Sequence, residues 1–240
     1  MRLKVIACKV LMRELYTLAA KSNNVVDIIW LKQALHNEPD RLRAQLQTAI
    51  DRIEGEEEQY DAILIGYGLC SNGIVGLHTQ RTPLVIPRAH DCISLLLGSR
   101  KRYQELFDEH SGGIYWYSRG WLEHSLMPGK DRHDKQYQEY AEKYGEDNAQ
   151  YLMDMEQGWM KEYNLAVGIW WPSIGREPVE GETRSSAEFL KWNCRMEEGS
   201  DALLWRMLEG HWDKEDFLVV PPGSKVVPSF TEGIVRAEST

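Results

Sequence analysis

The sequence predicts an α/β protein with an open, mostly parallel, doubly wound sheet and a helical, aromatic-rich insertion. Short apolar stretches alternate with stretches that carry apolar residues at helical spacing, and this pattern is typical of parallel strands joined by crossover helices. After residue 110 the chain becomes polar, aromatic and helix-rich. We therefore expect an α/β core at 1–110, a helical insertion or cap at 111–163, and at 164–240 a return to the core with a C-terminal strand.

Each expected strand is a short apolar run that stops at a turn or a polar residue. Residues 25–31 (VVDIIWL) show the pattern well, since β-branched side chains favour strands. The third run stops at Gly66 and Gly68 within GYGLCSNG, which predicts a tight turn from strand to helix. The expected strands lie at 3–8, 25–31, 61–66, 83–86, 112–118, 165–171 and 217–220.

The expected helices follow the strands. Leu11, Leu15 and Leu18 recur at helical spacing. The second helix has a sharp start, because Asn37 can cap it and Pro39 suits its first turn. Further helices are expected at 74–77, from Asp91 to Phe107 with an interruption at Gly98, within 119–163, and from 186 to Gly210, followed by the strand at 217–220, a turn at 221–223 and a frayed tail.

Composition narrows the classes of function. The chain has 240 residues, of which 42% are apolar and 27% charged, with a formal net charge of −9. This acidic balance argues against nucleic acid and anionic membrane surfaces as partners, because both attract clustered Lys and Arg. No apolar run is long enough for a signal peptide or a membrane span. We expect a cytoplasmic protein whose cysteines are reduced.

Three of the four cysteines fall where the expected strands end. Cys8 ends the first strand, Cys70 follows the third, and His90 and Cys92 follow the fourth. Ligands of open parallel sheets bind outside these carboxyl ends. Thiolate and imidazole together suit zinc, and three thiolates also suit an iron–sulfur cluster. In an extended segment His90 and Cys92 would point the same way. We therefore expect Cys8, Cys70, His90 and Cys92 to hold a metal.

Several residues near these strand ends have more than one possible role. Buried cysteines are often core filler, and Cys70 with His90 could instead form a metal-free nucleophile–base pair. Arg88 is a candidate for binding a substrate carboxylate or phosphate, or a surface ion pair. His36 is a candidate acid–base group or fourth ligand, or a solvated residue at a helix start. Cys194 lies in a polar context and is a weak candidate for ligation.

Two further segments have features of cofactor sites. Backbone N–H groups of GYGLCSNG could hold an anion, which makes Gly66, Gly68, Ser71 and Asn72 candidate cofactor-binding residues. Trp121 and nearby aromatic residues could form the wall of a planar ligand site, although such residues more often pack in a core. The other aromatic candidates are Tyr115, Trp116, Tyr117, Trp170 and Trp171.

Several segments together resemble a family of bacterial and archaeal proteins known only as a domain of unknown function. The GYGLCSNG and PRAHDC motifs are the most distinctive, and the resemblance covers most of the chain. Members tend to occur in organisms with corrinoid-dependent methyl transfer and other one-carbon chemistry. The matching segments are IACKVLMREL (6–15), YDAILIGYGLCSNGIVGL (60–77), PLVIPRAHDCISLLLGSRKRY (83–103), GWLEHS (120–125) and FLVVPPG (217–223).

A local resemblance concerns zinc-dependent methyltransferases that alkylate thiols. These enzymes hold zinc through H-x-C and a distant cysteine, parts that His90, Cys92 and either Cys70 or Cys8 could play here. In those larger barrel enzymes the second cysteine follows H-x-C, whereas Cys8 and Cys70 precede it. The resemblance implies shared ligand chemistry rather than shared ancestry.

These observations lead to three hypotheses. The first is a zinc or iron–sulfur enzyme of small-molecule or one-carbon methyl-transfer metabolism. The second is a non-catalytic protein that carries a cluster or a corrinoid for maturation. The third is a metal-free Cys–His enzyme. The expected partners are a small-molecule substrate and, from the resemblance, a corrinoid protein or a methyltransferase; a homo-oligomer is compatible with the sequence.

Overall fold

The computed structural model describes residues 1–110, 113–229 and 234–239. The chain divides into two compact units. Unit 1 comprises Met1–Tyr103 and Ser200–Thr240, and unit 2 comprises Gln104–Gly199. Mixed α/β content and a mostly parallel central sheet confirm the predicted fold class. In the described part of the chain, no helix combines the length and the apolar character needed to cross a membrane.

A five-stranded sheet forms the centre of unit 1. Its order is β2-β1-β3-β5-β9, in which the first four strands run parallel and β9 is antiparallel to β5. Every residue of β3 and β5 is buried, as expected for parallel strands covered on both faces. The strands are β1 (Arg2–Cys8), β2 (Val25–Leu31), β3 (Ala62–Gly66), β5 (Leu84–Pro87) and β9 (Phe217–Val220).

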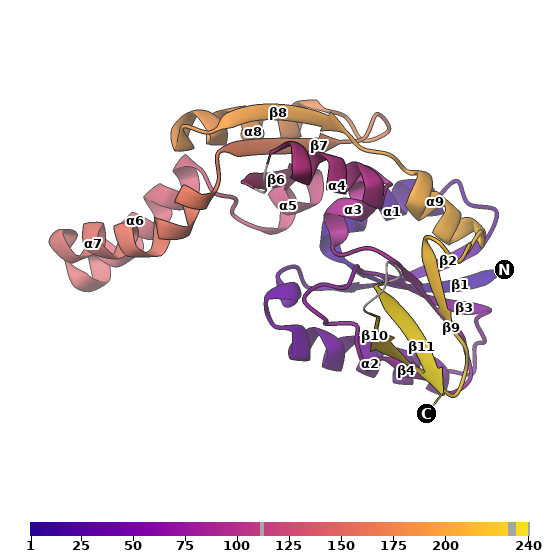
Figure 1. Cartoon of the computed structure of the whole chain (residues 1–240). Helices are drawn as coiled ribbons and strands as arrows, with labels where there is room; N and C mark the ends of the chain where they lie inside the picture. The colour runs from indigo at the N-terminus through magenta and orange to yellow at the C-terminus, as the bar shows by residue number, and fades with distance from the viewer. Residues whose placement is uncertain (111–112, 230–233, 240) are drawn as a thin grey trace. The chain divides into compact units, whose positions relative to one another are not determined.

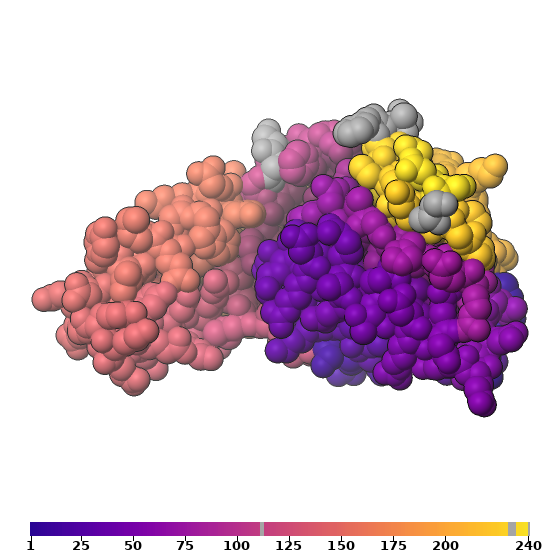
Figure 2. Space-filling view, turned by 90° about the horizontal axis from the view of Figure 1, so that it is seen from below, coloured from indigo at the N-terminus to yellow at the C-terminus, as the bar shows by residue number. Residues whose placement is uncertain are grey.

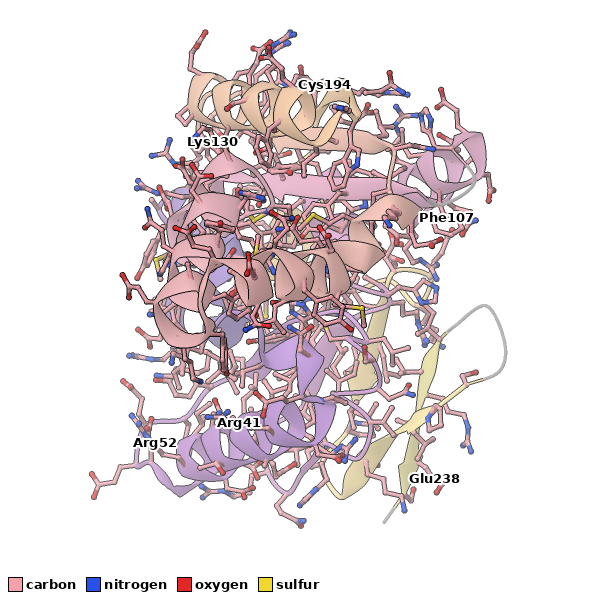
Figure 3. All side chains as sticks on the ribbon, turned by 90° about the vertical axis from the view of Figure 1, so that its left-hand side faces the viewer. Arg41, Arg52, Phe107, Lys130, Cys194 and Glu238 are labelled. Carbon is pink, nitrogen blue, oxygen red and sulfur yellow. The ribbon has the colours of Figure 1, made fainter. Side chains whose placement is uncertain are left out.

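Helices cover both faces of this sheet. Figure 1 shows α1, α3 and α9 above it and α2 below it, which is the doubly wound arrangement. On α2 the buried stripe is Leu42, Leu46, Ile50 and Ile53, whereas Arg41 and Arg52, labelled in Figure 3, are exposed. The helices of unit 1 are η1 (Lys9–Leu11), α1 (Met12–Ala19), η2 (Leu35–Asn37), α2 (Pro39–Gly55), α3 (Cys92–Leu97) and α9 (Ala202–Glu209), and α4 (Arg100–Glu109) begins in unit 1 and ends in unit 2.

A small antiparallel sheet completes unit 1. It joins β4 (His78–Thr79), β10 (Ser224–Pro228) and β11 (Val235–Ser239) in the order β11-β10-β4. Figure 2 shows this C-terminal segment, in yellow, against the purple N-terminal part of the same unit. The Glu54 carboxylate on α2 accepts hydrogen bonds from the Thr79 hydroxyl and from the backbone N–H groups of residues 80–82, so it fixes the turn that leads into β5.

Unit 2 has a sheet of its own, in the order β6-β7-β8 and parallel throughout. Its buried cluster contains Tyr117, Met127, Ala166, Val179 and Ala187. The elements are β6 (Ile114–Ser118), α5 (Arg119–His124), α6 (Lys130–Tyr144), α7 (Glu146–Glu156), η3 (Gln157–Glu162), β7 (Leu165–Trp170), α8 (Glu177–Leu190) and β8 (Asn193–Glu198).

Several expectations from the sequence differ from the structure. The strand expected at 165–171 exists as β7, but it pairs with β6 and β8 and not with the central sheet. The boundaries between the two compact units lie at 103/104 and 199/200, whereas the sequence predicted boundaries at 110/111 and 163/164. Residue 111 and Gly112, where a boundary and a strand start were expected, lie outside the described residues.

Local expectations also need correction. The N-cap position of α2 is held by Glu38, which makes no side-chain capping hydrogen bond, because Asn37 belongs to the preceding 3-10 turn. Residues 74–76 form turns and Leu77 is irregular, so no helix forms here, since the chain enters this segment from left-handed backbone. Polar residues 193–198 form the strand β8, and the tail expected to fray contributes β10 and β11.

Candidate functional site

Two neighbouring parallel strands of unit 1 bring the first site residues together. Cys8 is the last residue of β1, and Tyr67 directly follows β3. The chain leaves β1 toward β2 on one side and leaves β3 toward β5 on the other. The carboxyl ends of β1 and β3 therefore form the topological switch point, which is the place where open α/β sheets bind ligands.

The two distinctive motifs are joined by their backbones. Leu69 N–H donates to Ala89 C=O at 2.7 Å, and Cys70 N–H donates to His90 C=O at 2.9 Å. Gly68 makes this close approach possible, because a Cβ at this position would lie 2.6 Å from the Asp91 nitrogen and 2.8 Å from the Ala89 oxygen. The GYGLCSNG and PRAHDC segments therefore lie side by side in the candidate site.

Cys70 lies in an unusual turn. Three consecutive residues, Cys70, Ser71 and Asn72, have positive φ angles of 44°, 55° and 66°. Left-handed backbone costs an L-residue ~1–2 kcal/mol, and single residues are the usual case. Such strain persists where the surroundings impose it, and it clusters at functional sites. Cys70 itself is 8% exposed, so the turn directs its thiol inward.

Cys92 is placed by a helix start. Asp91 caps α3, and its carboxylate accepts from Ile93 N–H at 3.0 Å and from Ser94 N–H at 3.2 Å. The Tyr103 hydroxyl also bonds to this carboxylate. Cys92 is therefore the first residue of α3, and its thiol is buried although the residue keeps some exposed surface.

The thiols of Cys8, Cys70 and Cys92 lie within electrostatic reach of one another. Burial is the main cause that raises the pKa of each of the three. Cys70 reaches a pKa of about 12, with Asp91 and Cys8 as further causes. For Cys92 the further causes are Cys70, Cys8 and Asp91. Each negative charge formed here disfavours the next, so the cluster is suited to a cation.

Tyr67 belongs to the same cluster. It is 3% exposed, and its pKa is raised by burial and by the neighbouring Cys8, Cys70 and Cys92. Its hydroxyl lies beside the Cys8 thiol, yet no described group meets the geometry of a hydrogen bond with it. A thiol is a weak hydrogen-bonding partner, so this buried hydroxyl is only partly satisfied by Cys8.

The two predicted histidines, His36 and His90, both lie near Asp91 but differ in exposure. His36 is half-buried in η2, where burial lowers its pKa and the negative charge of Asp91 opposes this shift. His90 is exposed and influences Asp91, whereas the groups that act on the Cys92 thiol are Cys70, Cys8 and Asp91. Asp91, which lies between His90 and Cys92, has extended backbone with φ −153° and ψ −178°, and α3 starts directly after it, so a shared direction of His90 and Cys92 stays a prediction.

The remaining predicted residues have contacts of other kinds. Arg88 donates from Nε to the Lys214 carbonyl at 3.1 Å and also to the Val235 carbonyl, so it ties the C-terminal segments to β5. A Cβ on Gly66 would lie 2.6 Å from the Ala7 Cβ, which explains that glycine by strand packing. Ser71 and Asn72 are exposed on the left-handed turn.

Two predicted residues lie in unit 2. Trp121 packs against the buried cluster around Tyr117. Cys194 is exposed on β8, beside α8 (Figure 3). All four cysteines are free thiols. Within the described ranges, no group of three or more His, Cys, Asp or Glu side chains stands ready to hold a metal ion. The catalytic, cofactor and metal roles of the predicted residues stay predictions.

Sequence reasoning gave no role to Tyr67 and Tyr103, and it considered Asp91 only as a group that orients a ligand histidine. Tyr67 stands two positions before the Leu69–Cys70 step, Asp91 caps α3, and Tyr103 bonds to Asp91. The one signal in the sequence is the pattern of a carboxylate before a helix, which predicts Asp91 as a cap and leaves Cys92 in the first turn. Nothing in the sequence marks a tyrosine whose hydroxyl is buried.

Comparison with known proteins gives one result. A family model described as a protein of unknown function (DUF1638) matches residues 30–208. This range contains Tyr67, Cys70, Asp91 and Cys92, whereas Cys8 precedes it. No curated protein and no solved structure matches the chain. Since the match extends over well over half of the 240 residues, the chain belongs to the DUF1638 family of proteins of unknown function.

Proposed function

We propose that this protein binds zinc or an iron–sulfur cluster through Cys8, Cys70 and Cys92 and uses it in small-molecule metabolism. One observation carries the proposal. Three buried thiols from three separate segments converge at the switch point of the sheet. Converging thiolates are the ligands that zinc and iron–sulfur clusters prefer. Ligand binding requires rotation of these side chains, because the thiols do not form a ready-made ligand group.

The surroundings of the thiols favour a metal over a metal-free nucleophile. A nucleophilic cysteine needs a lowered pKa, supplied by a nearby cation or a helix start. Here burial and the neighbouring acidic groups raise the pKa of Cys70 to about 12. A bound cation would lower the pKa of these thiols, because it compensates the negative charge of several thiolates at once.

Three protein ligands favour an enzyme. Structural zinc sites have four protein ligands, whereas catalytic sites keep one position open for water or substrate. His90, which is exposed beside Asp91, is the candidate for a fourth ligand in a closed site. Methyl-transfer or other one-carbon chemistry, with a corrinoid protein or methyltransferase as partner, is supported by the family resemblance. A carrier of a cluster or corrinoid is the alternative that the same three thiols support.

The test is metal analysis of matched variants. We expect about one zinc ion, or one cluster, per chain after anaerobic purification, because one set of thiols is present. Cys70→Ala and Cys92→Ala should lower the metal content at least about tenfold, as removal of a ligand does. Cys194→Ala is the control, since this exposed thiol belongs to unit 2.

The visible spectrum separates the candidates. A colourless protein with stoichiometric zinc supports the enzyme, and a brown protein with iron and sulfide supports the cluster. Absence of both metals in aerobic and anaerobic preparations alike would refute the proposal. Equal metal loss in Cys194→Ala and Cys70→Ala would refute the assigned ligands.

A further inference from the structure

The outer side of β2 is an open edge of the central sheet. β2 pairs with β1 over seven consecutive residues, and among the described residues no other strand pairs with it. In the described part of the chain, the outward-facing N–H and C=O groups of residues 26–31 make no hydrogen bonds with other segments. Such a row of open donors and acceptors is a template for another β-strand.

β2 lacks the usual features that keep sheet edges apart. It is seven residues long, contains no proline and no lysine, and keeps its register with β1 without a bulge from Val25 to Leu31. Every residue of VVDIIWL keeps exposed surface, although Asp27 is the one charged residue among them. Beside the strand, the Trp30 indole N–H donates to the hydroxyl of Tyr16, which is 52% exposed. An apolar edge with adjoining aromatic side chains is typical of a protein interface.

The charge at this edge is balanced. The Asp27 carboxylate lies 3.4 Å from Arg2 Nη2 and accepts from the Tyr60 hydroxyl at 3.2 Å. Glu58 also pairs with Arg2, and Lys4 donates to the Tyr60 hydroxyl, so two positive and two negative groups meet here. The edge is therefore close to neutral on a chain whose net charge is −9, and it attracts neither a basic nor an acidic partner. A partner with an equally neutral apolar edge fits it.

The residues of β2 match one another in antiparallel order. A two-fold axis through Ile28 places this residue opposite its own copy and Val26 opposite Trp30. These three side chains alternate along the strand and so share one face of the sheet, where they form a row of β-branched and aromatic pairs. Asp27 then lies opposite Ile29, so the two carboxylates do not face each other.

We propose that β2 is a dimer interface, at which it pairs antiparallel with β2 of a second copy of this chain and joins two five-stranded sheets into one. The pairing supplies hydrogen-bond partners to the outward backbone groups of both copies. It also occupies the open edge of each copy, so the assembly closes at two chains. This inference goes beyond the proposed function and does not depend on a metal.

The test is analytical ultracentrifugation of the wild type and of two charge variants. We expect a wild-type dimer that dissociates in the micromolar range, the weak end for protein interfaces. Ile28→Lys and Ile28→Glu should each raise the Kd at least about 100-fold, because like charges then meet at the two-fold axis. An equimolar mixture of the two variants should recover the dimer, because opposite charges then meet there.

Val219→Lys is the matched control. Val219 is 41% exposed on β9, the strand at the other edge of the same sheet, so this variant should keep the wild-type Kd. Circular dichroism shows whether each variant is folded. Should an Ile28 variant not fold, hydrogen exchange of the wild type decides, because the amides of residues 26–31 should exchange more slowly in concentrated than in diluted protein.

Several outcomes would overturn the proposal. A wild-type chain that stays monomeric up to about 1 mM would leave this edge to a strand of another protein. Persistence of the dimer in Ile28→Lys, or an equal loss in Val219→Lys, would place the interface elsewhere. Folded Ile28 variants that do not associate when mixed, or amide exchange that is independent of concentration, would exclude self-pairing of β2.

Discussion

Replacing Gly68 with alanine should separate the two segments that carry Cys70 and Cys92. The added Cβ would lie 2.6 Å from the Asp91 nitrogen and 2.8 Å from both the Ala89 oxygen and the Asp91 Cα. All three atoms are backbone, so no flexible side chain can turn away. Relief of such an overlap costs ~1–3 kcal/mol in a packed region.

The overlap also weakens the bonds between the two segments. These are Leu69 N–H to Ala89 C=O and Cys70 N–H to His90 C=O, each of which contributes about 1 kcal/mol. Together the two effects should lower the free energy of unfolding by about 2–4 kcal/mol. Urea unfolding followed by circular dichroism measures this change. In the native protein, Gly68→Ala should also speed the labelling of Cys8 and Cys70, which are 5% and 8% exposed in the wild type.

Gly55→Ala is the control for this experiment. Gly55 ends α2 in the same unit, and a Cβ there would meet nothing within 4 Å. This variant should be neutral or about 0.4–1 kcal/mol more stable, because alanine restricts the unfolded chain. If Gly68→Ala unfolds within about 0.5 kcal/mol of the wild type, the range of ordinary surface substitutions, the close backbone packing of the two motifs is refuted.

Two further predictions concern the framework of unit 1. Glu54→Ala should lower the free energy of unfolding by about 1.5–3 kcal/mol at neutral pH, because the Glu54 carboxylate accepts hydrogen bonds from the Thr79 hydroxyl and the N–H groups of residues 80–82. The control is Glu57→Ala, which removes an exposed carboxylate and should change this free energy by less than about 0.5 kcal/mol. Burial alone would raise the pKa of Glu54, but these bonds outweigh it and hold the pKa below its ordinary value of 4.5. The difference between wild type and Glu54→Ala is therefore full above pH 4.5 and is lost as the pH falls below 4.5 through the lower pKa of the folded state. A constant difference in urea midpoints down to about pH 3 would contradict this prediction. Asp91→Ala should lower the free energy of unfolding by about 0.5–2 kcal/mol, because α3 loses its N-cap. Asp91→Asn should recover most of this stability in the same unfolding assay, because asparagine also caps helices. Equal destabilisation by both variants would show that capping is not the cause.

The sequence was sufficient for the elements whose residues are buried. The runs at 3–8 and 61–66 are apolar except for Lys4 and Asp61 and form β1 and β3, and Gly98 ends α3 with a φ of 70° as its position suggested. The strand β8 was missed because its residues NCRMEE are mostly exposed or half-buried and show no apolar alternation. A strand is predicted from its pattern when its residues are apolar or β-branched, as in the half-buried β2, and β8 lacks that pattern.

The site could be predicted in outline and not in detail. Strand ends place Cys8, Cys70 and Cys92 correctly near one another, because parallel strands end at one edge of a sheet. His90 was expected beside Cys92 on the assumption of extended backbone, and Asp91 between them is extended, but the sequence did not show that Asp91 also caps α3. The left-handed turn at 70–72 has no sequence signal, since tertiary contacts and not glycine impose it.

The antiparallel strand β9 has a consequence for synthesis of the chain. It pairs Val220 with Leu84, so β5 receives its second neighbour from a segment made 136 residues later. At ~5–20 residues per second, the ribosome takes roughly 10 s to produce that partner. During this interval β5 is an exposed strand edge of an incomplete sheet, and such edges pair readily with other chains. Newly made unit 1 therefore has its greatest need of chaperone protection while unit 2 is being translated.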